Sequence, residues 1–290
     1  QIAKSQPRQI LLLGHGENSI YTILEEVLEK KDDNISYVPI IADVQNRKRM
    51  FEVFEKYRPD IVYHAAAHKH VPMMESNTRE AVKNNVIGTK NTAEAACHFK
   101  TSKFVMISTD KAVNPSSVMG ATKRAAERVV HQLNSRGDTR FTVVRFGNVL
   151  GSNASVVPIF KDQIERGGPI TITHQDATRF FMSIPEAVRL VLHSGAIGQS
   201  GDLCILDMGD QVKIAEIAEN LIRMAGKIPH QDIDIVFTGA RPGEKLCEEL
   251  FTQLEARSLE RVGKILRCQP DKCDWDEYDA WLERLKSAAH

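Results

Sequence analysis

The most chemically varied stretch of this 290-residue chain follows an apolar run at residues 103–107. Its hydroxyl, carboxyl, amino and thioether groups belong to Thr109, Asp110, Lys111, Met119 and Lys123. Asp110 and Lys111 are adjacent, so a carboxylic acid and an amine can serve one substrate as proton donor and proton acceptor. Met119 and Lys123 are four residues apart, which places them on the same face of a helix. The stretch predicts an acid–base site between the end of a strand and the start of a helix.

This stretch resembles the active-site segment of the extended short-chain dehydrogenases/reductases, where Ser or Thr at a strand end is followed by Tyr-x-x-x-Lys. Within that family, Ser108-Thr109-Asp110-Lys111 and Met119-Gly-Ala-Thr-Lys123 are similar to the UDP-N-acetylglucosamine 4,6-dehydratases of polysaccharide and glycan biosynthesis. The large, membrane-anchored branch of these enzymes carries Met where relatives carry Tyr. The resemblance extends over nearly the whole chain.

The resemblance implies that the protein dehydrates a nucleotide sugar with the help of NAD. Oxidation at C4 of the hexose gives a ketone that acidifies the C5 proton, water leaves across C5 and C6, and hydride returns to C6. In this reaction Asp110 is expected to be the acid toward the C6 hydroxyl and Lys111 the base at C5. Thr109 is expected to hydrogen-bond the C4 hydroxyl, and Lys123 to bind the nicotinamide ribose hydroxyls.

Met119 is the departure from the usual pattern, because a thioether cannot take the C4 hydroxyl proton as a tyrosinate would. Either Asp110 serves twice, or Thr109 passes the proton on through water or the ribose. In the family a Met at this position accompanies retention at C5. We therefore expect a C5-retaining dehydratase.

The residues expected to hold the cofactor lie at the ends of the first strands. They are His15, Glu17, Asn18, Asp43, Val44, Ala65, Ala66 and Ala67, together with Lys123. A carboxylate at Glu17 can accept from a ribose 2′-hydroxyl, which favours NAD, whereas His15 is also compatible with the 2′-phosphate of NADP. Asp43 is expected to accept from the adenine amino group, and the small alanines let a cofactor lie against backbone.

Gly14-His-Gly16 is not interpreted as the dinucleotide fingerprint, because the third glycine is missing. Between Gly14 and Asp43 there is room for only one helix and one strand. In the family that the chain resembles, the strand that ends in Asp followed by a hydrophobic residue is the third, here ending at Asp43-Val44, so residues 10–13 are expected to be the second strand of the fold. The first strand and its glycine-rich turn are then expected upstream of residue 1, in a longer parent protein.

The substrate-binding residues expected from the resemblance are Lys69, His70, Asn148, Ser152, Thr173, Arg179, Arg241 and Glu244. Arg241 begins an Arg-Pro-Gly-Glu-Lys motif and suits a diphosphate, because a guanidinium can bind two oxygens. Glu244 is expected at the uridine ribose and Asn148 at the phosphates. The three histidines His64, His68 and His70 lack a partnering Cys or Asp, so we expect no metal site.

The elements that position these residues alternate between strand and helix, which predicts an α/β fold with a doubly wound, parallel Rossmann-type sheet. Strands are expected at residues 10–13, 37–42, 60–66, 103–108, 141–148 and 203–208. Helices are expected at residues 19–30, 49–56, 80–99, 120–134 and 185–194. Residues 1–149 and 176–208 would form the dinucleotide-binding domain. Residues 150–175 and 209–290 would form a smaller nucleotide-sugar-binding domain.

The amino-acid composition limits the kind of protein that this chain can be. The 38 basic and 38 acidic residues balance, so no nucleic-acid-binding surface is expected. The five cysteines show no metal-ligand spacing, which indicates reduced thiols in the cytoplasm. No run reaches transmembrane length. The resemblance implies a homo-oligomer that meets the inner face of the cell membrane only through a segment outside this chain.

Three other functions remain open from the sequence. A C5-inverting dehydratase or a nucleotide-sugar 4-epimerase would use the same fold, although an epimerase needs no acid–base pair at C5–C6. A non-catalytic nucleotide-sugar-binding subunit belongs to a different class, and tightly bound dinucleotide after purification would argue against it.

Overall fold

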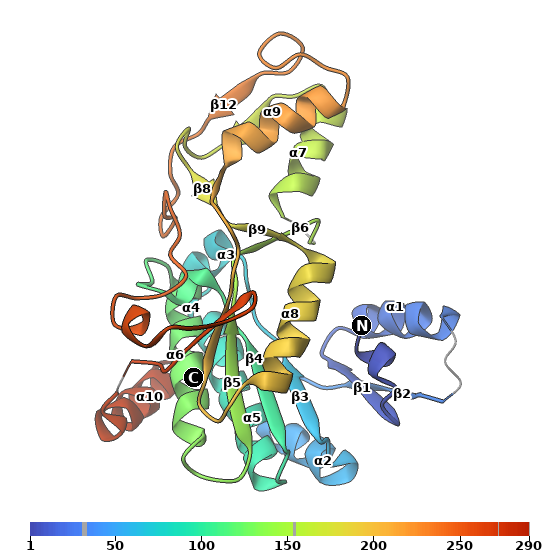
Figure 1. The fold of residues 1–290 in the computed structure, drawn as a ribbon, viewed down its shortest axis with the longest axis vertical. Helices are drawn as coiled ribbons and strands as arrows, with labels where there is room; N and C mark the ends of the chain where they lie inside the picture. The colour runs from blue at the N-terminus through green and yellow to red at the C-terminus, as the bar shows by residue number, and fades with distance from the viewer. Residues whose placement is uncertain (31–33, 153–154, 272, 290) are drawn as a thin grey trace.

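The main body is a mostly parallel sheet with helices on both faces (Figure 1). The computed structural model describes residues 1–30, 34–152, 155–271 and 273–289. Within these residues the sheet order is β13-β14-β10-β5-β4-β3. The strands are β3 (Ile61–His64), β4 (Lys103–Ile107), β5 (Arg140–Arg145), β10 (Leu203–Leu206), β13 (Glu260–Val262) and β14 (Ile265–Cys268). Strands β3, β4, β5 and β10 are parallel, while β14 and β13 add antiparallel pairs. The predicted α/β class is confirmed.

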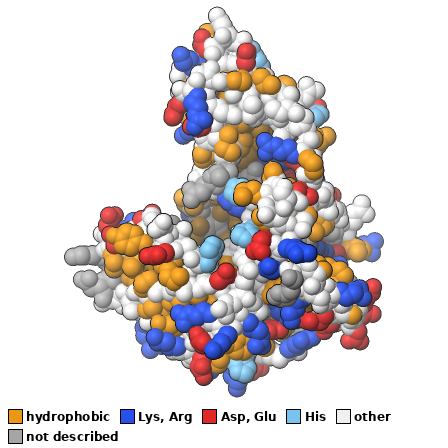
Figure 2. Space-filling model, turned by 180° about the vertical axis from the view of Figure 1, so that it is seen from behind, with side chains coloured by type: hydrophobic (Ala, Val, Ile, Leu, Met, Phe, Trp, Pro, Cys, Tyr) orange, Lys and Arg blue, Asp and Glu red, His pale blue; other side chains and the backbone are white. Residues whose placement is uncertain are grey.

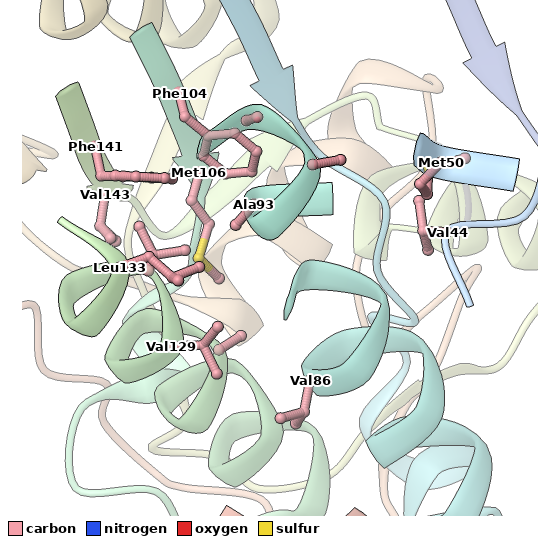
Figure 3. Packing of buried hydrophobic residues seen from close by; sticks show 14 of the residues in the cluster. Val44, Met50, Val86, Ala93, Phe104, Met106, Val129, Leu133, Phe141 and Val143 are labelled. Atoms are coloured by element: carbon pink, nitrogen blue, oxygen red, sulfur yellow. The ribbon is translucent and has the colours of Figure 1, made fainter. Parts of the chain in front are cut away.

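Alternation along the central strands builds a hydrophobic core on each face of the sheet. Phe104 and Met106 of β4 face one core, and Val105 between them faces the other. The same alternation holds in β5, where Phe141 and Val143 lie in the first core. Successive side chains of a strand point to opposite faces, so strands covered on both sides are apolar throughout. Figure 3 shows the first core from close by.

The helices divide between these two cores. The first core is covered by α2 (Arg47–Tyr57), α5 (Gly88–His98), α6 (Val118–Leu133) and α10 (Trp275–Ala289). The second core is covered by α8 (Ile184–Ile197). Helix α5 continues a helical run that starts with α4 (Thr78–Ala81) and passes through a π-helix at Val82–Ile87.

A small separate sheet carries the first elements of the chain. It consists of β1 (Gln9–Gly14) and β2 (Ser36–Ile41), which pair in parallel and are covered by α1 (Glu17–Glu29). Among the described residues, neither strand pairs with the six-stranded sheet, and this lobe lies to one side in Figure 1. Large hydrophobic side chains are exposed on it, including Tyr21 and Ile41, and Figure 2 shows hydrophobic atoms gathered there.

A second lobe lies beyond the carboxyl ends of the central strands (Figure 1). It contains α7 (Val156–Glu165), β7 (Ile170–Ile172), α9 (Ile214–Met224) and β12 (Ile235–Phe237), which share their own apolar core. Short pairs join it to the body: β6 (Asn148–Leu150) with β9 (Phe181–Ser183), and β8 (Thr178–Arg179) with β11 (Val212–Lys213).

The division expected at residue 209 differs from this arrangement in one respect. Strands β13 and β14 extend the main sheet, and α10 packs on its helical layer, so the end of the chain returns to the main body. No helix in the described part of the chain is long and apolar enough to cross a membrane.

Candidate active site

The acid–base pair lies where β4 ends. Thr109 caps a 3-10 helix at Asp110–Ala112, and its hydroxyl donates to Asp110 Oδ1 at 2.9 Å. Lys111 Nζ donates to the same oxygen at 3.0 Å. Asp110 is fully buried, and its Oδ2 has no hydrogen-bond partner among the described residues. A buried carboxylate oxygen without a protein partner is available to a substrate hydroxyl.

Asn148, the first residue of β6, makes a second contact with Lys111. Lys111 Nζ donates to Asn148 Oδ1 at 3.3 Å, while the lysine side chain is still 21% exposed. Gly147 precedes this asparagine, and a Cβ there would lie 3.1 Å from Asp110 Oδ2. The missing side chain at Gly147 therefore keeps space open beside the carboxyl group.

Helix α6 packs directly against this strand end. Ser117 caps the helix by accepting from the Gly120 amide, and a Cβ at Gly120 would overlap the Lys111 carbonyl oxygen. Gly120, which lies between Met119 and Lys123 in the sequence, thus lets helix α6 approach the Lys111 backbone closely. The expected helix at residues 120–134 begins slightly earlier, at Val118, because Ser117 supplies the cap.

Lys123 points back to the strand rather than to solvent. Its Nζ donates to the Ile107 carbonyl oxygen at 2.6 Å, and its side chain is buried. Burial lowers the pKa of Lys123 to about 8, an effect that the carboxylate of Glu127 opposes. Nearby His64 is buried as well, and burial together with the charge of Lys123 lowers its pKa to about 3.

Met119 packs into a small apolar cluster with Met74 and Ala81, bordered by Val71 and Val118. Its thioether therefore fills space beside the site and can only influence the chemistry through shape.

A π-helix supports the site from behind. Asn85 within it is fully buried, and its Nδ2 donates to the His68 carbonyl oxygen and to Thr122 Oγ1, each at 3.0 Å. The loop after β3 is thereby tied to the residue that precedes Lys123. Sequence reasoning missed Asn85, although π-helical turns often mark functional sites.

A cavity of about 170 Å³ connects the acid–base pair with distant parts of the chain. Its lining residues are Val71, Pro72, Lys111, Ser116, Ser117, Arg179, Arg241, Gly243, Glu244, Lys245 and Glu248. Lys111 and the Arg-Pro-Gly-Glu-Lys segment, far apart in sequence, thus face one space. Gly243 has a φ of +77°, and a Cβ there would lie 2.9 Å from Ser117 Cβ, so glycine permits this approach.

Three of the expected substrate residues, Arg179, Arg241 and Glu244, line this cavity, and a fourth, Thr173, contacts Glu244. Arg179 Nη2 donates to Glu244 Oε1 at 3.1 Å, and Thr173 Oγ1 donates to the same oxygen at 2.9 Å. Arg241 is exposed on the cavity wall. The structure does not bring Ser152 into the lining, because it lies in the turn after β6.

The loop after β3 approaches the same cavity. His70 is the residue before α3 (Val71–Ser76), whose first two residues line the cavity, and Lys69 is exposed just before it. The three histidines of this region are not brought together with acidic partners. Among the described residues, no group of His, Cys, Asp and Glu could hold a metal ion.

The expected cofactor residues are divided between the two sheets. Ala65 and Ala66 are exposed directly after β3, where they leave the backbone accessible. His15, Glu17 and Asn18 are exposed at the turn from β1 into α1, and Asp43 follows β2. Carboxyl ends of parallel strands are where such folds bind nucleotides.

The side chain of Val44 is part of the hydrophobic core and does not face the expected cofactor site. It packs into the first core, and its carbonyl oxygen accepts from Asn91 Nδ2 at 3.0 Å. A Cβ at Gly88 would lie only 2.6 Å from Val44 Cγ2. Asp43 Oδ1 accepts from the Gln45 amide at 2.8 Å, which holds this loop in place.

A buried ionic network lies beneath the site. Arg145 at the end of β5 donates to both carboxylate oxygens of Glu127 at 2.8 and 2.7 Å and to both of Glu255 at 2.8 and 3.0 Å. Ser108 Oγ donates to Glu127 at 2.6 Å. Burial alone would raise the pKa of Glu127, but the attraction and hydrogen bonds of Arg145 outweigh it and lower the pKa to about 2.

This network is only partly predictable from the sequence. An arginine directly after the mostly apolar residues 141–144 indicates a charge at a buried strand end, but nothing local identifies Glu127 and Glu255 as its partners. Glu248 was missed for the same reason, since its burial depends on contacts from elsewhere in the chain.

With this geometry established, comparison with known proteins identifies the class. Residues 1–270 match the family described as polysaccharide biosynthesis protein. CapD, a capsular polysaccharide biosynthesis protein of Staphylococcus aureus, is 56% identical over 286 residues, which cover 98% of this chain and 48% of CapD. EpsC of Bacillus subtilis strain 168 is 54% identical over 283 residues, covering 98% of this chain and 47% of its own length. The chain spans about half the length of these curated relatives.

The chain therefore belongs to the polysaccharide biosynthesis protein family, as the resemblance predicted. It is also 35% identical over 252 residues to a UDP-glucose 4-epimerase of Rickettsia rickettsii, covering 86% of this chain and 72% of that enzyme. The relatives of the chain thus include a protein that is named a nucleotide-sugar epimerase.

Solved structures of other proteins share the fold of this chain. Pen from Bacillus thuringiensis is 33% identical with a TM-score of 0.84, covering 92% of this chain and 83% of Pen. DesIV from Streptomyces venezuelae, a dTDP-glucose 4,6-dehydratase solved with NAD and TYD, has a TM-score of 0.74 at 17% identity. The match covers 99% of this chain and 91% of DesIV, and it confirms the Rossmann-type fold.

Proposed function

We propose that this chain is the catalytic part of a UDP-N-acetylglucosamine 4,6-dehydratase that retains the configuration at C5. The observation that carries the proposal is the shared cavity. Lys111, which contacts Asp110, lines the same space as Arg179, Arg241 and Glu244. A 4,6-dehydratase needs an acid–base pair near C5 and C6 and cationic groups for the diphosphate of the same substrate.

The proposed roles follow from the contacts at the end of β4. Lys111 takes the C5 proton, and the electron pair left at C5 forms the double bond to C6 as the C6 hydroxyl leaves. Asp110 supplies the proton with which that hydroxyl leaves as water, through the Oδ2 atom that has no protein partner among the described residues. Thr109 contacts Asp110 and is placed to hydrogen-bond the C4 hydroxyl, so the proton released when C4 is oxidised passes through Thr109 to Asp110, which later gives it to the C6 hydroxyl. Lys111 returns its proton to C5 as hydride returns to C6.

We propose NAD as the cofactor, held by Ala65–Ala67 and Lys123 at the nicotinamide end. The nicotinamide, when bound, supplies the redox chemistry by accepting hydride from C4 and returning it to C6. Lys123 Nζ contacts one carbonyl and is able to donate further hydrogen bonds to ribose hydroxyls. Exposed backbone after β3 fits a flat ring laid against it.

The adenosine end is assigned to His15, Glu17, Asn18, Asp43 and the backbone of Val44. We propose that a parallel strand, supplied by chain upstream of residue 1, lies between β1 and β3. Support comes from the lack of pairing between the two sheets among the described residues and from Ile41 and Ile61, which are exposed at 49% and 48%.

Substrate contacts are assigned to the cavity wall. Arg241 and Asn148 would bind the diphosphate, while Glu244 and Thr173, already hydrogen-bonded to each other, would face the uridine ribose. Lys69 and His70 are assigned to the sugar side because α3 lines the cavity. Oligomeric state and position at a membrane remain predictions from the resemblance.

The test is product analysis by liquid chromatography, which separates isomers of equal mass, coupled to mass spectrometry after the protein is incubated with UDP-N-acetylglucosamine and NAD. This chain and a version extended upstream by about 30 residues, the length of a βα unit, are compared. We expect loss of one water from the sugar nucleotide, at least in the extended version. Conversion to an isomer of unchanged mass would instead support a 4-epimerase. Binding without any conversion in either version would support the non-catalytic subunit.

A further inference from the structure

Glu248 is a buried carboxylate without an assigned role. Its side chain is only 3% exposed, although it belongs to the irregular segment at residues 241–249. Its Oε1 lies 3.5 Å from Lys111 Nζ, and its Oε2 is buried without a hydrogen-bond partner among the described residues. Burial of a carboxylate is costly unless a positive charge compensates it, so this position needs an explanation.

Lys111 is the cation that best accounts for Glu248. Arg179 is the other nearby cation, but its Nε lies 4.0 Å from Glu248 Oε1, and its Nη2 already pairs with Glu244 at 3.1 Å. Lys111 has four rotatable side-chain bonds and is held by its neighbour Asp110 at 3.0 Å. Glu248 therefore adds a contact from a distant segment, which restricts where the amino group can lie.

We propose that Glu248 is a positioning residue for Lys111 and that it couples the 241–249 segment to the acid–base pair. The inference rests on the proposed dehydratase function and deepens it. In its ammonium form Lys111 pairs with Glu248, and it acts as the base only after it has lost that proton to water. When the free amine takes the C5 proton the ammonium ion forms again, and the carboxylate of Glu248 stabilises its charge. Glu248 itself exchanges no proton with the substrate. Because Arg241 begins the same segment, diphosphate binding and alignment of the base are joined in one piece of chain.

The test compares Glu248→Gln with the matched control Glu249→Gln. Glu249 is adjacent, but its side chain is 54% exposed and contacts Lys245 and Asn114 on the surface. In the full-length protein, we expect Glu248→Gln to lower kcat for dehydration and the rate of C5 deuterium exchange about tenfold to a hundredfold, within the range for coupled neighbours. The KM and the calorimetric Kd for UDP-N-acetylglucosamine should change less than threefold, since roughly the same groups bind the substrate.

A second readout does not depend on activity. Acetylation of Lys111 by limiting acetic anhydride is followed by mass spectrometry against Lys103, whose amino group donates to the Gly195 and Ala196 carbonyls at the far end of β4. We expect Lys111 to be labelled several times faster relative to Lys103 in Glu248→Gln and unchanged in Glu249→Gln. Thermal melting of both variants records any general loss of stability.

The outcomes separate the two proposals. A wild-type protein that dehydrates the substrate, together with a Glu248→Gln variant of unchanged kcat and Lys111 labelling, overturns the positioning role alone. A drop in substrate affinity equal to the drop in kcat also overturns it, because that pattern indicates a role in binding. A wild-type protein without dehydration overturns the proposed function, and the Lys111 labelling then still decides whether Glu248 holds this side chain.

Discussion

Lys111 is the side chain on which the contacts of the site converge. It meets Asp110 from its own strand end, Asn148 from β6 and Glu248 from the 241–249 segment. Adjacency in the sequence was enough to pair Asp110 with Lys111. The other two partners could not be predicted, because they depend on how distant segments fold over the sheet.

At this scale, Asp110→Asn is expected to reduce dehydration at least about 100-fold, the usual contribution of a general acid. Asparagine keeps the size of the side chain and can still accept from Thr109 and Lys111, so substrate affinity should change little. Initial rates and calorimetric binding measure the two effects. Asp138→Asn, in an exposed loop at the other end of the sheet, is the control and should match wild type.

A second residue-scale prediction concerns His131, whose two ring nitrogens are buried and have no hydrogen-bond partner among the described residues. Burial lowers its pKa to about 4, although Glu127 opposes this shift. The unfolded chain, with a pKa of 6.5, therefore binds the proton first as pH falls, and the free energy of unfolding decreases between about pH 6.5 and pH 4.

His131→Leu should remove this part of the pH dependence, which amounts to at most about 3 kcal/mol. Urea unfolding at several pH values measures it, and the difference in stability between variant and wild type should grow as the solution is acidified. Parallel pH profiles for the two proteins would contradict the prediction.

At the scale of elements, most strands and helices were predictable because their patterns are local. Helix α6 begins close to its expected start, since Ser117 caps it, and strands β4 and β10 are apolar on both faces. The expected strand at residues 141–148 ends instead at Arg145, and Asn148 starts the separate strand β6. Beyond this break, Asn148 pairs with Phe181 of β9 in a separate two-stranded sheet, a long-range contact that no local pattern reveals.

The ionic network joins these elements, and Glu127→Gln tests its contribution. Removing one carboxylate leaves the fully buried Arg145 with incomplete compensation, so we expect a loss of about 3 kcal/mol in the free energy of unfolding. Asp279→Asn breaks the exposed pair with Arg136 and should cost less than about 1 kcal/mol. Denaturant titrations compare the two variants, and equal losses would contradict a structural role for the buried network.

At the scale of the whole molecule, the site is assembled from three bodies: the main sheet, the lobe of β1 and β2, and the lobe beyond the strand ends (Figure 1). The fold class was predictable from the alternation of elements. The return of β13, β14 and α10 to the main body was not predictable, because the sequences of short antiparallel strands and of a C-terminal helix do not indicate which element they pack against.

Proton NMR of UDP-N-acetylglucosamine in heavy water, with NAD and the protein extended upstream, tests whether the enzyme is a C5-retaining 4,6-dehydratase. For such an enzyme we expect loss of the C6 methylene signals, a new 6-methyl group, deuterium at C5 and ring couplings that report retention. Unchanged C6 signals in the presence of demonstrated substrate binding would contradict this function.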